Sequence, residues 1–178
     1  MKISVHTMAV DSFVPMLRNL SRILDKGAAH ANAKNLDSAA LVNAKLAPDM
    51  FALALQIQIA CDHAKDTAAR LTGAEPPRYE NAEQTFDDLK ARIEKTIGYV
   101  ERARAAAFEG AEDRDVKIPV PGTTMAIEMN GLQFLRDYAL PNFYFHVATA
   151  YDILRHNGVE IGKIDYLSHV GQYVRQGG

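Results

Sequence analysis

The chain has 178 residues, of which 48% are hydrophobic and 24% are charged, and its formal net charge is -2. This length and balance are typical of one globular domain, so we expect a single domain over residues 1–178. The near-neutral charge argues against a general nucleic-acid-binding protein, which would usually show a basic patch. The lone cysteine, Cys61, excludes a disulfide framework and suits a reducing compartment.

The first ten residues, MKISVHTMAV, contain no basic region followed by an apolar core and therefore do not resemble a signal peptide. The longest apolar run, Met50–Leu55, is far too short to cross a bilayer. These two features predict a cytoplasmic protein without a membrane partner.

The first half of the chain predicts three helices. Apolar residues recur at three- and four-residue steps over Val5–Ala29, where Pro15 marks either a kink or the true start of the helix. A short helix is predicted over Ser38–Asn43. A second long helix is predicted over Pro48–Gly73, and its first half is apolar almost all round, which places it centrally in the core.

A third long helix is predicted from Ala82 to Ala107, after the break EPPRYEN. Its apolar positions form one stripe, which we expect to be buried: Phe86, Leu89, Ile93, Ile97 and Val100. Its charged positions are expected to face water: Lys90, Arg92, Glu94 and Lys95.

The apolar period then changes from helical spacing to alternation. Residues 116–120 and 125–127 alternate around a Pro121-Gly122 turn, which predicts a β-hairpin. Four long amphipathic helices must bury their apolar faces against one another, so the predicted fold is all-α, a four-helix bundle with a small β-hairpin before the last long helix. We expect the hairpin to interrupt the up-down order of the helices.

The last long helix is predicted to begin near Asn130, to bend at Pro141 and to end at Asn157. Polar residues interrupt its aromatic and aliphatic surface along one face. Burial of a polar group without a partner costs roughly 2–7 kcal/mol, so these groups must be hydrogen-bonded or must bind something. The stripe comprises Leu135, Tyr138, Asn142, His146, Thr149, Ile153 and His156.

The chain resembles a family known as the domain of unknown function numbered nineteen ninety-three, in three segments: FVPMLRNLSRILDKGAAHA, NAKLAPDMFALALQIQIACDHAK and LPNFYFHVATAYDILRHNG. This family belongs to the DinB/YfiT-like superfamily of proposed metalloenzymes. The resemblance implies a divalent metal ion between helices, held by one histidine of the second helix and an HxxxH pair of the fourth. The matching positions here are Gln58, Asn142 and His146, so one histidine of three is kept. The resemblance also implies a homodimer.

Two interpretations of these positions remain open. Gln58 and Asp62 share a helical face and are expected to point towards Asn142 and His146, forming an oxygen-rich set that suits Mg²⁺ or Mn²⁺ better than Zn²⁺. Alternatively, the same groups form a buried hydrogen-bond network, in which Lys65 takes the place of a cation. With Thr149 from the polar stripe, the candidate ligand-binding set is Gln58, Asp62, Asn142, His146 and Thr149.

Other reactive residue types favour structural roles. His63 lies about 100° round its helix from Asp62, so it is expected to be a partly exposed surface histidine unless the helix is rotated. His156 lies about 15 Å along the helix from His146, too far to share a metal with it. Cys61 lies in the middle of a helix, without the cations that activate a thiol, and is expected to pack in the core.

Two classes of function follow from these residues. The first is a metal-free, dimeric bundle whose degenerate metal site acts as a ligand-binding or structural pocket, with Tyr144 and Tyr151 on the opposite face forming the subunit interface. The alternative is a metal-dependent enzyme of the thiol-transferase or hydrolase type that uses His146. No serine-histidine-aspartate arrangement, phosphate-binding glycine loop or HExxH motif supports another enzyme class.

Overall fold

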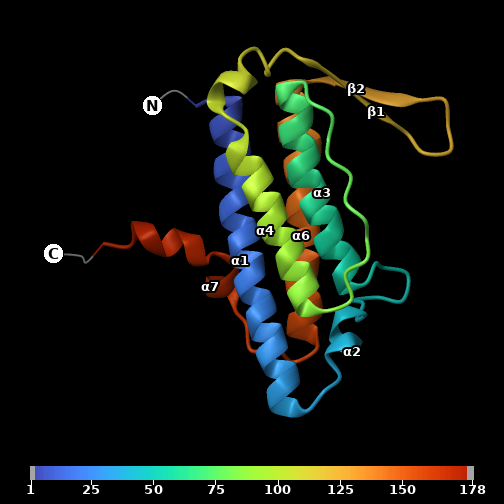
Figure 1. Ribbon diagram of the computed structural model, residues 1–178, viewed down its shortest axis with the longest axis vertical. Coiled ribbons are helices and arrows are strands. Elements are labelled where there is room, and N and C mark those ends of the chain that lie inside the picture. Colours follow the sequence, from blue (N-terminus) through green and yellow to red (C-terminus); the bar gives the residue numbers. More distant parts are fainter. Residues whose placement is uncertain (1–2, 176–178) are drawn as a thin grey trace.

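Four long helices form the body of the molecule in the computed structural model, which describes residues 3–175 (Figure 1). They are α1 (Val5–Lys34), α3 (Leu53–Thr72), α4 (Phe86–Arg102) and α6 (Leu140–His156). The predicted four-helix bundle is therefore confirmed. A short helix, α2 (Ser38–Val42), lies at the predicted position between the first two long helices.

The helices do not follow a simple up-down order. Figure 1 shows α3 and α4 running in the same direction, antiparallel to α1 and α6. This arrangement requires an extended connection, residues 73–85, which runs back along the length of α3 and is called the crossover segment below. The order is therefore broken between α3 and α4 and not at the hairpin, where the break was predicted, because α4 and α6 are antiparallel.

Local capping explains where the helices begin and end. Helix α3 starts at Leu53 rather than at Pro48, because Leu53 donates its backbone N–H to Ala44 O (2.9 Å) at the end of an intervening turn. It ends at Gly73, whose φ of 73° is easily reached only by glycine. Helix α4 starts later than predicted, because Thr85 and Asp88 form a capping box.

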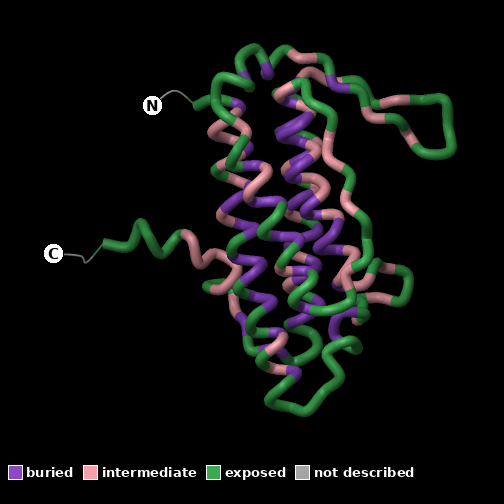
Figure 2. Tube along the Cα trace, in the orientation of Figure 1, coloured by how far each residue is buried: buried purple, intermediate pink, exposed green. Residues whose placement is uncertain are grey.

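The core runs along the inner faces of the four helices, which are buried over most of their length (Figure 2). All five apolar residues predicted to line α4 are buried. Of the charged residues predicted to face water on this helix, Arg92 does not, because it is only 3% exposed. It lies between Leu89 and Thr96 on the flank of the apolar stripe, where the helical period alone does not separate core from surface.

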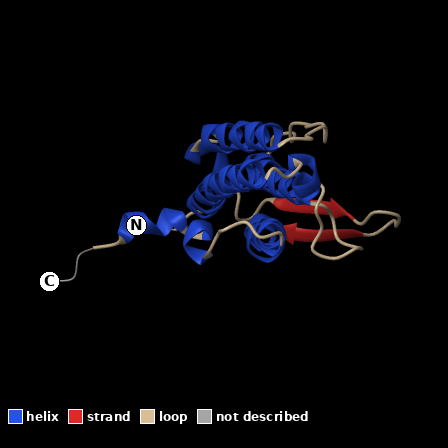
Figure 3. Ribbon diagram, turned by 90° about the horizontal axis from the view of Figure 1, so that it is seen from below, coloured by secondary structure: helices blue, strands red, loops and turns tan. Residues whose placement is uncertain are grey.

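The predicted hairpin consists of β1 (Asp115–Pro119) and β2 (Ala126–Asn130), paired antiparallel with Ile118 opposite Ile127. Figure 3 shows the two strands to one side of the helix bundle. A 3₁₀ helix, η1 (Ala105–Phe108), follows α4 and leads into the hairpin.

The last long helical segment begins immediately after the hairpin, as predicted, with Asn130 as its N-cap. Its first turn, α5 (Gly131–Gln133), requires glycine at its start, because a Cβ on Gly131 would lie 1.8 Å from Ala111 O. A π-helical segment, η2 (Phe134–Ala139), then leads into α6. Pro141 follows at once, and the wider turn accommodates a ring that would clash with the preceding α-helical turn.

The C-terminal segment consists of α7 (Lys163–Tyr166) and the 3₁₀ helix η3 (Ser168–Tyr173), which projects away from the bundle (Figure 1). Tyr166 packs edge-on against Tyr151 of α6, with 6.0 Å between ring centroids. Over residues 3–175, none of the helices combines the length and apolar character that crossing a membrane requires.

Candidate functional site

One face of α3 is turned towards α4 and the crossover segment. Gln58 donates a hydrogen bond from Nε2 to Glu83 Oε2 (2.9 Å), and Asp62 Oδ1 accepts one from Arg92 Nη2 (2.9 Å). The partners of Gln58 and Asp62 therefore lie on α4 and the crossover segment, not on α6. The structure does not bring these two predicted site residues together with His146.

The charged groups on this face neutralise one another. Arg92 Nη1 donates to Glu80 O (2.9 Å) and to Glu83 Oε1 (3.0 Å), which holds the crossover segment against α4. Lys65 Nζ lies 3.2 Å from Asp62 Oδ1 and 2.6 Å from Asp66 Oδ1. Asp62 and Lys65 are thus paired, as the network alternative to a cation expected, but their partners are Arg92, Glu83 and Asp66 rather than Asn142 and His146.

The opposite face of α3 meets α6, and there Gln56 holds His146. Gln56 donates from Nε2 to Phe51 O (3.1 Å), which turns its Oε1 towards His146 Nδ1 at 2.7 Å. Since an amide oxygen only accepts, Nδ1 of His146 carries the proton. The Nε2 atom of His146 is therefore left with its lone pair.

His63 lies opposite His146, with its ring stacked at 5.8 Å between centroids and an interplanar angle of 20°. It also lies 6.0 Å from the ring of Tyr138, one turn before Asn142. His63 is partly exposed, as predicted, but its ring faces α6. Helix α3 is thus rotated from the orientation that placed Gln58 in the site. Gln56 and His63 are seven residues apart, which is about two helical turns, so they lie on the same face of α3. This spacing is the signal in the sequence that could have placed both residues at the site.

Asn142 lies on α6, one turn after Tyr138 of η2 and one turn before His146. Its Nδ2 donates to Tyr138 O (2.7 Å), so the amide oxygen Oδ1 is the atom left for another partner. Thr149 differs, because its hydroxyl donates to Phe145 O (2.8 Å) of its own helix. Of the predicted residues on α6, His146 and Asn142 lie at the site, and Thr149 lies one turn beyond His146.

Both imidazoles at this site are held in the neutral form. Burial, together with a smaller effect of the neighbouring His63, lowers the pKa of His146 to about 4. Burial also lowers the pKa of His63, against the opposing effect of the Asp66 and Asp62 carboxylates. Near neutral pH, His146 therefore offers a hydrogen-bond acceptor and a potential metal ligand at Nε2.

These residues do not complete the metal site that the superfamily resemblance implies. The site supplies two imidazoles and the amide oxygen of Asn142, which is a weak ligand. Within residues 3–175, no three His, Cys, Asp or Glu side chains converge as metal ligands. A three-ligand histidine site is therefore not formed, and no chemical step is derived from a bound metal.

The remaining candidates have structural surroundings. Cys61 is buried, and burial raises the pKa of its thiol to about 12, although a hydrogen bond with Thr96 opposes the shift. Such a thiol is not a nucleophile near neutral pH, in agreement with the predicted core position. His156 is exposed in the last turn of α6. Tyr151, predicted at a subunit interface, packs against Tyr166 of its own C-terminal segment.

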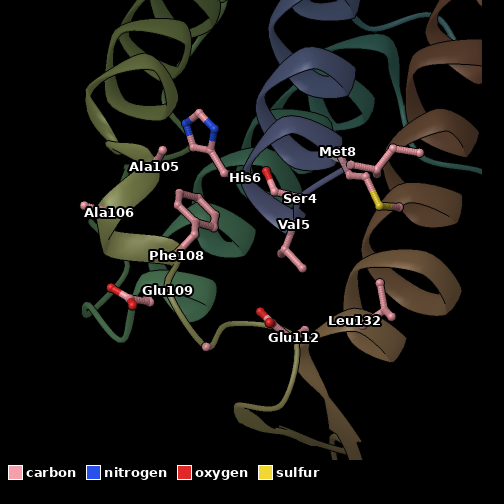
Figure 4. Close-up of a pocket in the computed structure, with 12 residues that line it drawn as sticks. Ser4, Val5, His6, Met8, Ala105, Ala106, Phe108, Glu109, Glu112 and Leu132 are labelled. Atoms are coloured by element: carbon pink, nitrogen blue, oxygen red, sulfur yellow. The ribbon is translucent and has the colours of Figure 1, made fainter. Parts of the chain in front are cut away.

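A cavity of about 790 Å³ lies elsewhere, between the start of α1 and η1. Figure 4 shows His6 and Phe108 next to each other there, and their rings meet edge-on at 5.1 Å. In the described part of the chain, three buried side-chain atoms lack a hydrogen-bond partner: Thr67 Oγ1, Arg92 Nε and Arg114 Nε. None of these atoms belongs to the walls of this cavity, so no unsatisfied polar group there requires a ligand.

Comparison with known proteins agrees with this architecture. A family model described as "Domain of unknown function (DUF1993)" matches residues 5–167. The crystal structure of a DinB family member protein from Shewanella denitrificans is 42% identical in sequence, with a TM-score of 0.82, over 91% of this chain and 90% of that one. No curated protein matches the chain.

Proposed function

Because the chain belongs to the DUF1993 family of unknown function and has a DinB-like fold, we propose that it binds a small molecule between α3 and α6, at a degenerate metal site. The observation that carries this proposal is the state of His146. Its proton is fixed on Nδ1 by Gln56, and its Nε2 accepts no hydrogen bond from residues 3–175. A preorganised acceptor of this kind favours a ligand that donates a hydrogen bond to Nε2.

The surroundings favour an uncharged, partly aromatic ligand. His146 is only 8% exposed, and transfer of a charge into such a position is costly. Phe145 is 56% exposed, and its ring lies 5.2 Å from the ring of His146, so an apolar surface adjoins the acceptor. Tyr138 adds a second ring next to His63. A small molecule with an aromatic body and one O–H or N–H group matches these features.

Phenol is a suitable probe of this proposal. In protein labelled with ¹⁵N-histidine, we expect phenol to shift the Nε2 signal of His146 saturably. The variant His146→Phe should lose this binding, whereas the matched variant His156→Phe, at an exposed position of the same helix, should keep it. No saturable shift, or equal binding by both variants, contradicts the proposal.

A metal-dependent enzyme of the thiol-transferase or hydrolase type remains the second candidate. It is favoured by the tautomer of His146, because a ligating imidazole is commonly oriented by a hydrogen bond from its other nitrogen. His63, His146 and Asn142 Oδ1 would hold the ion. Elemental analysis of protein purified without chelator tests this candidate. Near-stoichiometric metal in the wild type that is lost in both His63→Ala and His146→Ala would establish a metal site here. It would also contradict the proposal that this site no longer binds metal.

We also propose that the protein forms a homodimer. Support comes from η3 and the residues after it, where Val170 is 44% exposed, Tyr173 68% and Val174 75%. Such a run of exposed apolar side chains on a projecting segment favours contact with a second copy. Light scattering during size-exclusion chromatography should give the mass of a dimer, and Tyr173→Ser with Val174→Ser should shift it towards a monomer. A monomeric wild-type protein contradicts the proposal.

A further inference from the structure

A notch lies between the C-terminal end of α3 and the start of β1, at the hairpin end of the bundle. Its volume is about 300 Å³, at the small end of the range for ligand pockets. Three cationic side chains line it, Arg70, Arg114 and Lys117, against one carboxylate, Asp115. Lys117 is already paired across the hairpin with Glu128 (2.7 Å). Two guanidinium groups therefore dominate the charge of the notch.

These two guanidinium groups have no partner within the described chain. Neither Arg70 nor Arg114 forms a salt bridge or a side-chain hydrogen bond within residues 3–175, and Arg114 Nε is buried without an acceptor. Arg92, the other arginine with a buried Nε, differs because its remaining nitrogens bind Asp62 and Glu83. Since buried donors are nearly always satisfied, the acceptor of Arg114 Nε is a water molecule or a ligand.

The backbone next to the notch leaves room for Arg114. A Cβ on Gly73 would lie 2.5 Å from Arg114 Nη1, so the guanidinium lies close against the end of α3 where glycine leaves space. The partial negative charge at this helix end attracts the group but forms no hydrogen bond with it in the structure. The charge at the helix end thus explains the position of Arg114, but the N–H groups of its guanidinium form no hydrogen bond there.

We propose that this notch binds the phosphate group of a small-molecule ligand through Arg114 and Arg70. Planar guanidinium groups match the oxygens of phosphate geometrically, and two of them suit a dianion better than a single carboxylate. The site is separate from the His63–His146 pair. Arg70 lies on the same helical face as His63, but seven residues later, or about 10 Å along the axis.

Titration with inorganic phosphate at constant ionic strength tests the proposal by isothermal calorimetry. We expect saturable binding at one site per chain, a similar affinity for methyl phosphate, and weaker binding of acetate. The variants Arg114→Gln and Arg70→Gln should each weaken phosphate binding at least about tenfold, because each removes a charge-assisted hydrogen bond. Arg136→Gln is the matched control, since Arg136 is exposed and paired with Asp137.

The thermal midpoint of each variant without phosphate separates lost binding from lost folding, and Arg70→Gln decides the matter if Arg114→Gln does not fold. Absence of saturable phosphate binding overturns the proposal, as does equal affinity in the wild type and in both notch variants. Acetate that binds as tightly as phosphate overturns the assignment to a phosphate group. Loss of phenol binding at His146 leaves this inference unaffected, because the two sites share no residue.

Discussion

The two faces of α3 differ in how their polar groups are satisfied. On the face towards α4, Asp62 and Lys65 lie in a network in which every charge meets an opposite charge. On the face towards α6, His63 and His146 are neutral, and His146 is oriented by Gln56 with one nitrogen left free. A network in which each charge meets an opposite charge holds a structure together, whereas an oriented but unpaired acceptor is available to a ligand. Substitutions on the two faces should therefore have different effects.

The largest effect is expected from Arg92→Met. The Arg92 side chain is 1% exposed, and its removal leaves Glu83 and Asp62 without their main partner. Breaking a buried ion pair in this way costs about 3–5 kcal/mol of unfolding free energy. Urea denaturation followed by circular dichroism measures the loss.

Arg18→Met is the control for this change. Arg18 also pairs with a carboxylate on another helix, Glu101 at 2.6 Å, but both side chains are about half exposed. Exposed pairs contribute roughly 0–1 kcal/mol, so the control should be nearly neutral. A similar loss in both variants would show that burial of Arg92 does not stabilise the network.

The second effect is a pH dependence that belongs to the α6 face. The pKa of His146 is about 4 in the folded protein and about 6.5 when unfolded. Between these values the unfolded chain binds more protons, so stability falls as the pH falls through this window. The loss attributable to His146 is up to about 3 kcal/mol from pH 7 to pH 4.

Denaturation of the wild type and of His146→Phe over this pH range isolates the contribution of His146. The variant should show a shallower decline in stability than the wild type. Equal slopes in the two proteins would mean that His146 titrates normally in the folded state.

A third, smaller effect comes from a matched pair of buried glutamines. Gln58→Leu removes one hydrogen bond, to the crossover segment, and should cost about 1–2 kcal/mol. Gln56→Leu removes two, to His146 and to Phe51 O, and should cost at least as much. Only Gln56→Leu should alter the imidazole signals of His146 in NMR spectra. An altered His146 signal in Gln58→Leu would contradict the separation of the two faces.

The smallest effect is expected from Thr149→Val. The Thr149 hydroxyl donates its hydrogen bond to Phe145 O of its own helix, so its loss should change the unfolding free energy by less than about 1 kcal/mol. Phenol binding should be unchanged, measured by the same titration. Loss of phenol binding in this variant would show that Thr149 belongs to the ligand-binding site, as the polar stripe in the sequence predicted.

Much of the fold could be predicted because it depends on local patterns. Three examples are the apolar stripe of α4, the alternation around Pro121 and the helix stop at Asn157. Each of these signals is formed by residues that are close to one another in the sequence. The rotation of α3 could not be predicted, since Gln56 and Gln58 lie in the same apolar run, although Gln56 faces α6 and Gln58 faces the crossover segment. What decides between them is Glu83, which reaches Gln58 only because the crossover segment returns along α3.

The charged network was missed for a related reason. Arg92 lies three residues from the buried Leu89, so its helical position fits either the core or the surface. Only partners distant in sequence, Asp62 and Glu83, determine that it is buried. The candidate site was thus predicted on α6, where Asn142 and His146 are close in sequence, and misplaced on α3, where orientation depends on tertiary contacts.

The state of His146 is the most direct test, by ¹⁵N NMR spectroscopy of the histidine side chains as a function of pH. We predict a neutral ring protonated on Nδ1, with a pKa near 4, in the absence of any ligand. A ring protonated on Nε2 instead, or a pKa close to 6.5 as in an unfolded chain, would contradict the free acceptor on which the proposed site depends.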